Sequence, residues 1–143
     1  MENSSIKPST PWHLWVIGVF LLLWQGMASF DYLATLLRYE PYLSKFPEDA
    51  LEHYFAAPLW MYAMWGIASL GGLIAAILLL MRNKLSVPTF LIAWICGVVA
   101  TAYSFVNPPP NMEGAKMFGA IVIAASAMVL FYLYTMKKNG VLR

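Results

Sequence analysis

The residue whose type and position could do chemistry is Asp31, because it is the one charged side chain within a long apolar stretch. A carboxylate at mid-membrane depth costs about 2.5 to 3.5 kcal/mol on insertion scales, so such a group usually faces a bundle interior or a watery cavity. It shares a helical stripe with Thr35, which can donate to the carboxylate, and with Arg38. Two interpretations stay open: Asp31 binds a solute or a proton, or it is a structural tie to Thr35, Arg38 or a neighbouring helix.

Gln25 and several aromatic side chains are further candidates for binding. Gln25 lies on another stripe nearer the middle of the stretch, where an amide is typical of an interhelical hydrogen bond. Aromatic faces beside a carboxylate suit a sugar or an organic cation, although Tyr and Trp also form a belt at the headgroup level. The expected solute-binding residues are Asp31, Gln25, Tyr32, Trp60, Tyr62, Trp65 and Tyr103.

Other kinds of site are not indicated. The two histidines, His13 and His53, fall at opposite ends of a ~30 Å membrane core, so one metal or haem cannot use both. Neither a Ser/His/Asp or Cys/His grouping nor a glycine-rich phosphate loop is present. A net charge of +2 without a basic stripe argues against nucleic-acid binding. We therefore expect no catalytic residue, no metal and no cofactor, and a protein that is not an enzyme.

The elements that must position Asp31 are membrane spans. The chain has 143 residues, 61% hydrophobic and 11% charged, and it contains four charge-free runs of 23, 29, 28 and 20 residues. About 20 apolar residues in a helix cross a bilayer. The sequence predicts an all-α, integral membrane four-helix bundle that forms a single domain over residues 1–143. The expected spans are 12–36, 57–81, 86–106 and 117–136.

The distribution of charge predicts the orientation. The polar segments on the side of the two termini sum to +5, and those on the opposite side, with Asp31 counted at its border, sum to −3. Basic residues in short segments near span ends favour the cytoplasmic side. Both termini are therefore expected in the cytoplasm.

The outer connection between the first two spans is long enough for structure of its own. Pro47 suits a first helical position, and the acidic residues that follow it suit the positive end of a helix dipole. Leu51, Tyr54 and Phe55 then share one face. These features predict a short amphipathic helix, from residue 47 to about residue 55, on the outer membrane surface.

Small residues recur at spacings of three and four in the later spans, which places them on one face of each helix. Such faces let helix backbones approach closely in lipid. They predict a compact left-handed bundle, and the alternative is that one of them serves as a homodimer face. The residues are Ala68, Gly72 and Ala76, then Ala93, Gly97, Ala100 and Ser104, and then Ala120, Ala124 and Ala127.

Over residues 12–143 the chain resembles a family of small four-helix bacterial inner-membrane proteins, often labelled "sugar transporter" or hypothetical membrane protein. The motifs that carry the resemblance are Trp24-Gln25 and Phe30-Asp31-Tyr32 in the first span, and Pro58, Trp60 and Trp65 at the start of the second. The resemblance implies a bacterial inner membrane and four helices.

The favoured hypothesis is a small-solute binder or carrier with an outward-facing aromatic pocket around Asp31, whose ligand is a small polar or cationic solute. The alternative is a non-transporting accessory or assembly subunit that binds another membrane protein or lipid. The expected partners are the lipid bilayer and either a second copy of the chain or a membrane-protein partner.

Overall fold

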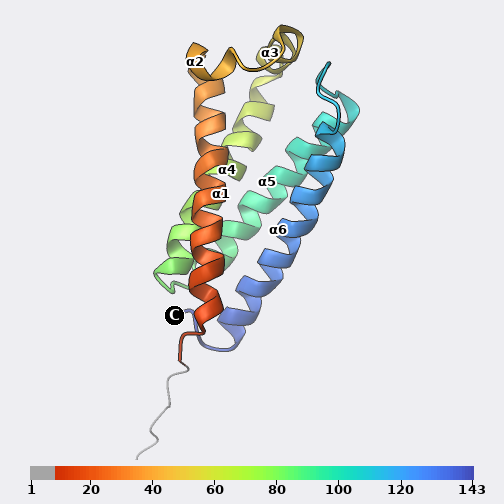
Figure 1. Cartoon of the computed structure of the whole chain (residues 1–143). Coiled ribbons are helices and arrows are strands. Elements are labelled where there is room, and N and C mark those ends of the chain that lie inside the picture. The colour runs from red at the N-terminus through yellow and green to blue at the C-terminus, as the bar shows by residue number, and fades with distance from the viewer. Residues whose placement is uncertain (1–8) are drawn as a thin grey trace, which may run out of the picture.

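The computed structural model describes residues 9–143, which fold into six helices with no strand in that range (Figure 1). Four helices are long and apolar enough to cross a membrane. This confirms the expected all-α fold with four spans, and the helix ends lie within two residues of the expected ones. The helices are α1 (Trp12–Leu36), α2 (Glu40–Leu43), α3 (Glu48–Phe55), α4 (Leu59–Leu80), α5 (Ser86–Val106) and α6 (Ala115–Lys138).

Prolines set the starts of three helices. Pro11, Pro47 and Pro58 each stand just before α1, α3 and α4 with an extended ψ of 140° to 154°. A proline has no N–H to leave unpaired at a helix start, and its fixed φ suits this position. The sequence places Pro47 at the first helical position, whereas in the structure it occupies the N-cap position just before a helix that begins at Glu48. The short helix α2 was not expected.

α4 occupies the centre of the bundle, between α1 and α5. Its glycines receive large side chains from α1: a Cβ at Gly66 would lie 2.6 Å from the hydroxyl oxygen of Tyr32, and one at Gly72 would lie 2.5 Å from Cδ of Gln25. The Ser29 hydroxyl also donates to the Ser69 carbonyl oxygen at 3.1 Å. Small residues therefore bring α1 and α4 together, as expected for helices in lipid.

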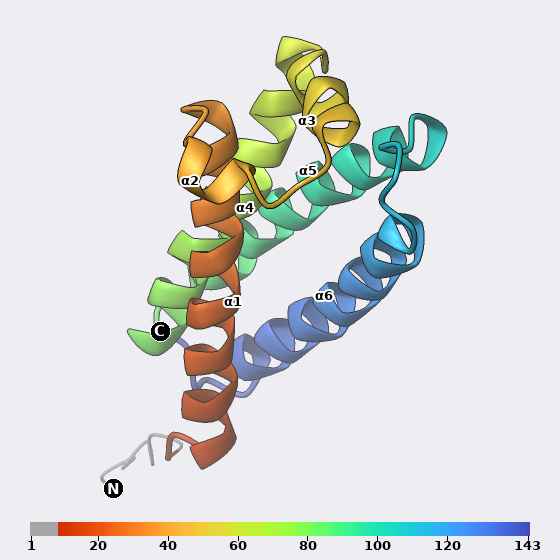
Figure 2. The same cartoon turned by 45° about the horizontal axis from the view of Figure 1, so that its top comes forward.

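α6 packs along α5 and leans away from α1 (Figure 2). A Cβ at Gly119 would lie 3.1 Å from the Thr101 methyl group, and the Trp94 indole N–H donates to the Ile123 carbonyl oxygen at 3.3 Å. The small residues of α6 do not form its contact within the bundle, because Ala120 and Ala124 are exposed and Ala127 is only half-buried. The alternative, that they serve as a homodimer face, stays a prediction. Gly119 and Ile123 lie on the face that meets α5 instead, so the bundle is open between α1 and α6.

The C-terminal tail closes the end of the bundle at which α1 begins. Val141 and Leu142 are each only 4% exposed and belong to a core cluster that also contains Leu14, Leu79 and Leu133. Two backbone hydrogen bonds hold the tail to the α4–α5 turn, one in each direction between residues 82–84 and 143, at 2.8 and 3.0 Å. The tail therefore acts as part of the core.

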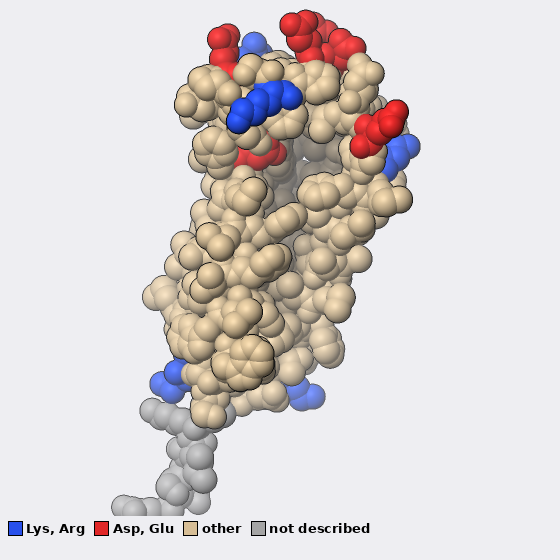
Figure 3. All heavy atoms as spheres, in the orientation of Figure 1, with Lys and Arg blue, Asp and Glu red and all other residues tan. Residues whose placement is uncertain are grey.

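Charged side chains gather at the two ends of the molecule (Figure 3). We call the end that carries α2, α3 and the α5–α6 connection the acidic end, and the end that carries the tail the basic end. Glu2 and Lys7, which entered the expected charge balance, lie outside the described residues. The acidic end carries Glu40, Glu48, Asp49, Glu52 and Glu113, and the basic end carries Arg82, Lys84, Lys137, Lys138 and Arg143.

Removing packing from the tail should loosen the whole bundle. We expect Leu142→Ala to lower the free energy of unfolding by about 2 to 5 kcal/mol, the range for a buried leucine cut to alanine. Leu85→Ala is the matched control, because Leu85 belongs to the same end but is 54% exposed. Denaturation of the detergent-solubilised protein would measure both. Equal stability of the two variants would show that the tail does not belong to the core.

Candidate functional site

A cavity of about 620 Å³ lies between the long helices at the acidic end. α1, α4, α5 and the start of α6 form its walls, and α3 and the α5–α6 connection cover it. This volume is in the range of small-molecule sites, which are typically apolar with a few polar groups. The aromatic and methionine side chains on its surface are Phe46, Tyr54, Met61, Trp65, Phe105, Met112 and Phe118.

Asp31 lies on the surface of this cavity, about one and a half turns below the end of α1. The hydroxyl group of Tyr42, in α2, donates to its Oδ1 atom at 2.8 Å. Tyr42 is held in place by edge-on contacts with Phe30 and Phe46, with ring centroids 5.1 and 5.4 Å apart. The carboxylate is only partly buried, so it remains accessible from the cavity.

The expected local partners of Asp31 are corrected by the structure. The Thr35 hydroxyl donates to the backbone carbonyl oxygen of Asp31 at 2.8 Å, not to the carboxylate. A threonine one turn further along a helix reaches the carbonyl oxygen of the preceding turn more readily than its side chain. The Arg38 guanidinium lies over the Phe55 ring, 4.4 Å from its centroid. Its partner is thus an aromatic ring in α3.

Two of the seven expected binding residues, Asp31 and Trp65, lie on the cavity surface. Gln25 and Tyr32 point from α1 into α4, where glycines receive them, so they pack between helices. Tyr32 also packs edge-on against Trp65, with centroids 5.2 Å apart. It therefore supports the wall from behind.

Trp60, Tyr62 and Tyr103 do not line the cavity either. Trp60 contacts Tyr103 edge-on, with centroids 5.4 Å apart, and is 49% exposed. The Tyr62 hydroxyl donates to the backbone carbonyl oxygen of Tyr54 at 2.7 Å and so ties α4 to α3. These three aromatics join neighbouring helices at the acidic end.

α3 is the cover of the cavity, and its contacts differ from those expected. Its apolar residues Leu51 and Tyr54 line the cavity. Asp49 accepts a hydrogen bond from the Asn111 amide at 2.9 Å, and His53 donates through Nε2 to the Asn107 carbonyl oxygen at 2.8 Å. The α5–α6 connection therefore holds α3 over the cavity.

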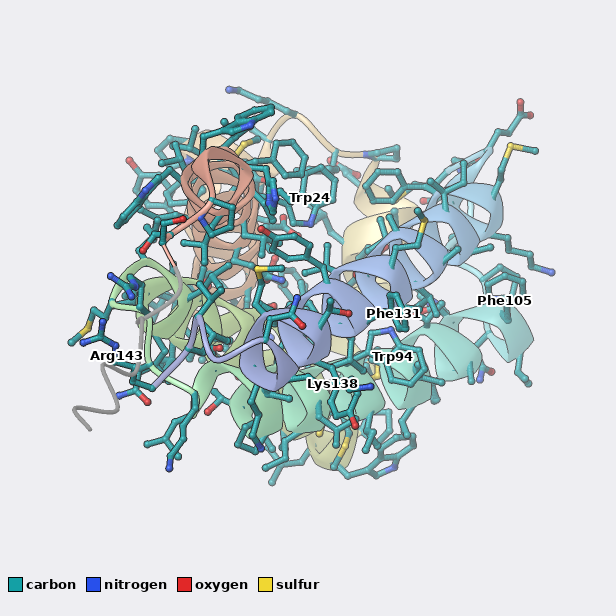
Figure 4. All side chains as sticks on the ribbon, turned by 90° about the horizontal axis from the view of Figure 1, so that it is seen from below. Trp24, Trp94, Phe105, Phe131, Lys138 and Arg143 are labelled. Carbon is teal, nitrogen blue, oxygen red and sulfur yellow. The ribbon has the colours of Figure 1, made fainter. Side chains whose placement is uncertain are left out.

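The open side of the cavity lies between α1 and α6, where Figure 3 shows a hollow below the acidic end. Trp24 projects from α1 toward this space (Figure 4) and is 36% exposed. Its ring centroid lies 6.1 Å from that of Phe118 in α6.

At the basic end, His13 Nδ1 lies 2.5 Å from the Tyr132 hydroxyl oxygen. These two pairs link α1 to α6.

The negative charge of Asp31 affects the tyrosines outside the spans. Burial, the hydrogen bond to Asp31 and the charge of Asp31 raise the pKa of Tyr42 from 10.0 to about 12. Burial and the charge of Asp31 also raise the pKa of Tyr54. Both phenols therefore stay neutral at ordinary pH, and Tyr42 remains a hydrogen-bond donor to the carboxylate.

The described residues contain no group of three or more His, Cys, Asp or Glu side chains that could hold a metal ion. His13 and His53 lie at opposite ends of the bundle, as expected, and each contacts a group on another helix or connection. No protein-family model, curated protein or solved structure matches the chain. The resemblance suggested by the sequence stays a prediction.

The contribution of the Tyr42 hydrogen bond to the free energy of unfolding should decrease at alkaline pH. The pKa of Tyr42 is higher in the folded protein, so the contribution is complete below pH 10 and is lost as the pH rises toward 12. We expect Tyr42→Phe to cost about 1 kcal/mol below pH 10, the typical net value of one hydrogen bond. The difference from the wild type should shrink between pH 10 and 12.

Denaturant unfolding at a series of pH values would measure this difference. Tyr39→Phe is the control, because Tyr39 is an exposed tyrosine just before α2, and its loss should change stability little below pH 10. A constant difference between Tyr42→Phe and the wild type up to pH 12 would contradict the assigned bond.

Proposed function

We propose that this protein binds and carries a small organic cation with apolar substituents in a bacterial inner membrane. The observation that carries the proposal is the position of Asp31: a carboxylate between the long helices on the surface of a mainly apolar cavity of about 620 Å³, whose two other charged lining residues, Glu113 and Lys116 at the start of α6, have opposite signs. Aromatic faces attract cations, and a nearby carboxylate adds direct charge attraction.

In this proposal the basic end lies in the cytoplasm, as do both termini, and the acidic end faces outward. The charge distribution supports this orientation, since the described residues of the basic end include no acidic side chain. The cavity then opens toward the outer half of the bilayer between α1 and α6. A cation with apolar groups would enter from the lipid, where such molecules concentrate.

The chemistry of binding needs no covalent step, cofactor or metal. The ligand's charge would pair with Asp31, while Trp65 and Phe118 would contact its apolar groups. Carriage requires a second state in which the cation leaves at the basic end, where Leu14, Leu79 and the tail are tightly packed. Alternating exposure of the site would therefore need α1 and α6 to separate at that end.

The decisive experiment measures cation binding to Asp31→Asn. The ligand is an aromatic quaternary ammonium ion, and its uncharged tert-butyl isostere is the control ligand. We expect at least a tenfold weaker affinity for the cation, about 1.4 kcal/mol, and an unchanged affinity for the isostere. The asparagine can still accept the Tyr42 hydrogen bond, so the fold should persist.

Glu48→Gln is the matched control variant, because it removes a carboxylate from the same end without touching the cavity. It should bind the cation as the wild type does. Equal cation affinity in Asp31→Asn and the wild type would refute the proposed role of Asp31. Uptake into proteoliposomes would then separate a carrier from a binding protein, because only a carrier accumulates the cation inside.

The accessory-subunit hypothesis has one observation in its favour, the exposed small-residue face of α6. Ala120 and Ala124 point away from the bundle, and small residues are what a neighbouring membrane helix would pack against. In that case Ala124→Trp should remove a stoichiometric membrane partner from the gently extracted protein. Cation binding should be unaffected. Retention of the same partner by Ala124→Trp would contradict this use of α6.

A further inference from the structure

A second concave site lies on the opposite side of α2 from the cavity. It is a groove of about 760 Å³ between the outer face of α1 and the overhanging α2, and we call it the α1–α2 groove. None of its lining residues lines the cavity around Asp31. The Tyr42–Asp31 hydrogen bond crosses the wall that separates the two sites.

The floor of the α1–α2 groove is apolar and follows the helix axis. Leu22, Gly26 and Phe30 repeat at a spacing of four, so they form a stripe roughly 12 Å long. At its centre, a Cβ built on Gly26 would have no heavy atom within 4 Å. Leu23 and Met27, 64% and 72% exposed, flank this depression. The shape suits one narrow, flexible chain.

The end of the groove under α2 carries a positive charge. Among residues 9–143, Lys45 is the one charged residue that lines the groove, and the Tyr39 hydroxyl adds a second hydrogen-bond donor. Both belong to the segment that follows α1, where a membrane's headgroups would lie. An apolar channel that ends at an ammonium group matches an acyl chain that ends at a phosphate.

A second protein helix fits this site less well. Helices pack closely where small residues repeat, whereas Gly26 is flanked by Leu23, Met27 and Phe30. α2 also overhangs the groove at the acidic end and would block a helix that continues along α1. These features favour a lipid as the occupant.

We infer that the α1–α2 groove is a specific phospholipid site, in which one acyl chain lies over Gly26 and the phosphate pairs with Lys45. The lipid would hold α2 against α1 and so support Tyr42 where it contacts Asp31. This inference does not depend on the proposed cation binding, since the two sites share no lining residue.

The test uses the full-length protein in neutral detergent, with phosphatidylglycerol and with diacylglycerol of the same chains, which lacks the phosphate. We expect native mass spectrometry to detect one retained phospholipid per chain. Phosphatidylglycerol should raise the unfolding temperature, whereas diacylglycerol or inorganic phosphate alone should not. Equal stabilisation by phosphatidylglycerol and diacylglycerol would overturn the assigned phosphate contact.

Two variants locate the lipid. Gly26→Leu should fill the groove and abolish both retention and stabilisation, while leaving the unfolding temperature without lipid near that of the wild type. Lys45→Gln should remove the preference for phosphatidylglycerol over diacylglycerol. Ala102→Leu places a leucine on an exposed face of α5 and should behave as the wild type does.

Retention of phospholipid by Gly26→Leu at the wild-type level would overturn the inference. So would a wild-type dimer that Gly26→Leu converts to a monomer with its lipid still bound, because the groove would then hold a second copy of the chain. Cation binding by Gly26→Leu, measured in the same preparation, should persist. This keeps a failure of the lipid site distinct from a failure of the cation site.

Discussion

The burial of the C-terminal tail against α1, α4 and α6 is the packing on which the rest of the structure depends. Val141 and Leu142 complete a dense apolar core at the basic end, and backbone hydrogen bonds to the α4–α5 turn fix their position. α6 is thereby held at one end and along α5, and it leans away from α1, which it meets near its start through the Trp24–Phe118 contact (Figure 2). The cavity at the acidic end follows from this arrangement, because two helices joined at one end and tilted apart leave space at the other.

Asp31 makes use of that space. A carboxylate within a membrane span is costly unless polar groups or water can reach it. Here the bond from Tyr42 satisfies one carboxylate oxygen, and the cavity gives the carboxylate access to water or a ligand. The same bond holds α2 over α1, so a single contact separates the cavity from the α1–α2 groove. α2 is only four residues long, and this anchorage explains how so short a helix can form a wall.

Much of the fold could be predicted from the pattern of charge. The four long helices and α3 lie where charge-free runs and the amphipathic stretch placed them, because hydrophobic length and periodicity are local properties. The composition of the site was harder to predict. Gln25 and Tyr32 are polar or aromatic residues near Asp31 in sequence, yet they fill the space above α4 glycines. Tyr42 follows Asp31 by eleven residues and lies beyond the end of α1, so the helical spacing of three or four residues does not predict their hydrogen bond. The cover of the cavity likewise depends on Asn111, whose contact with Asp49 joins two distant connections.

The sequence by itself determined that this chain has four apolar spans, that its charges divide between two ends, and that Asp31 is the exceptional group. Those properties follow from the identity of each residue and its neighbours along the chain. Only the tertiary structure decided which residues surround Asp31, that α3 turns its apolar face inward, and that the small face of α6 is left exposed. The reason is physical: lipid solvates every apolar helix face about equally, so composition does not fix which face meets a neighbour. Close packing at Gly66, Gly72 and Gly119 selects it instead.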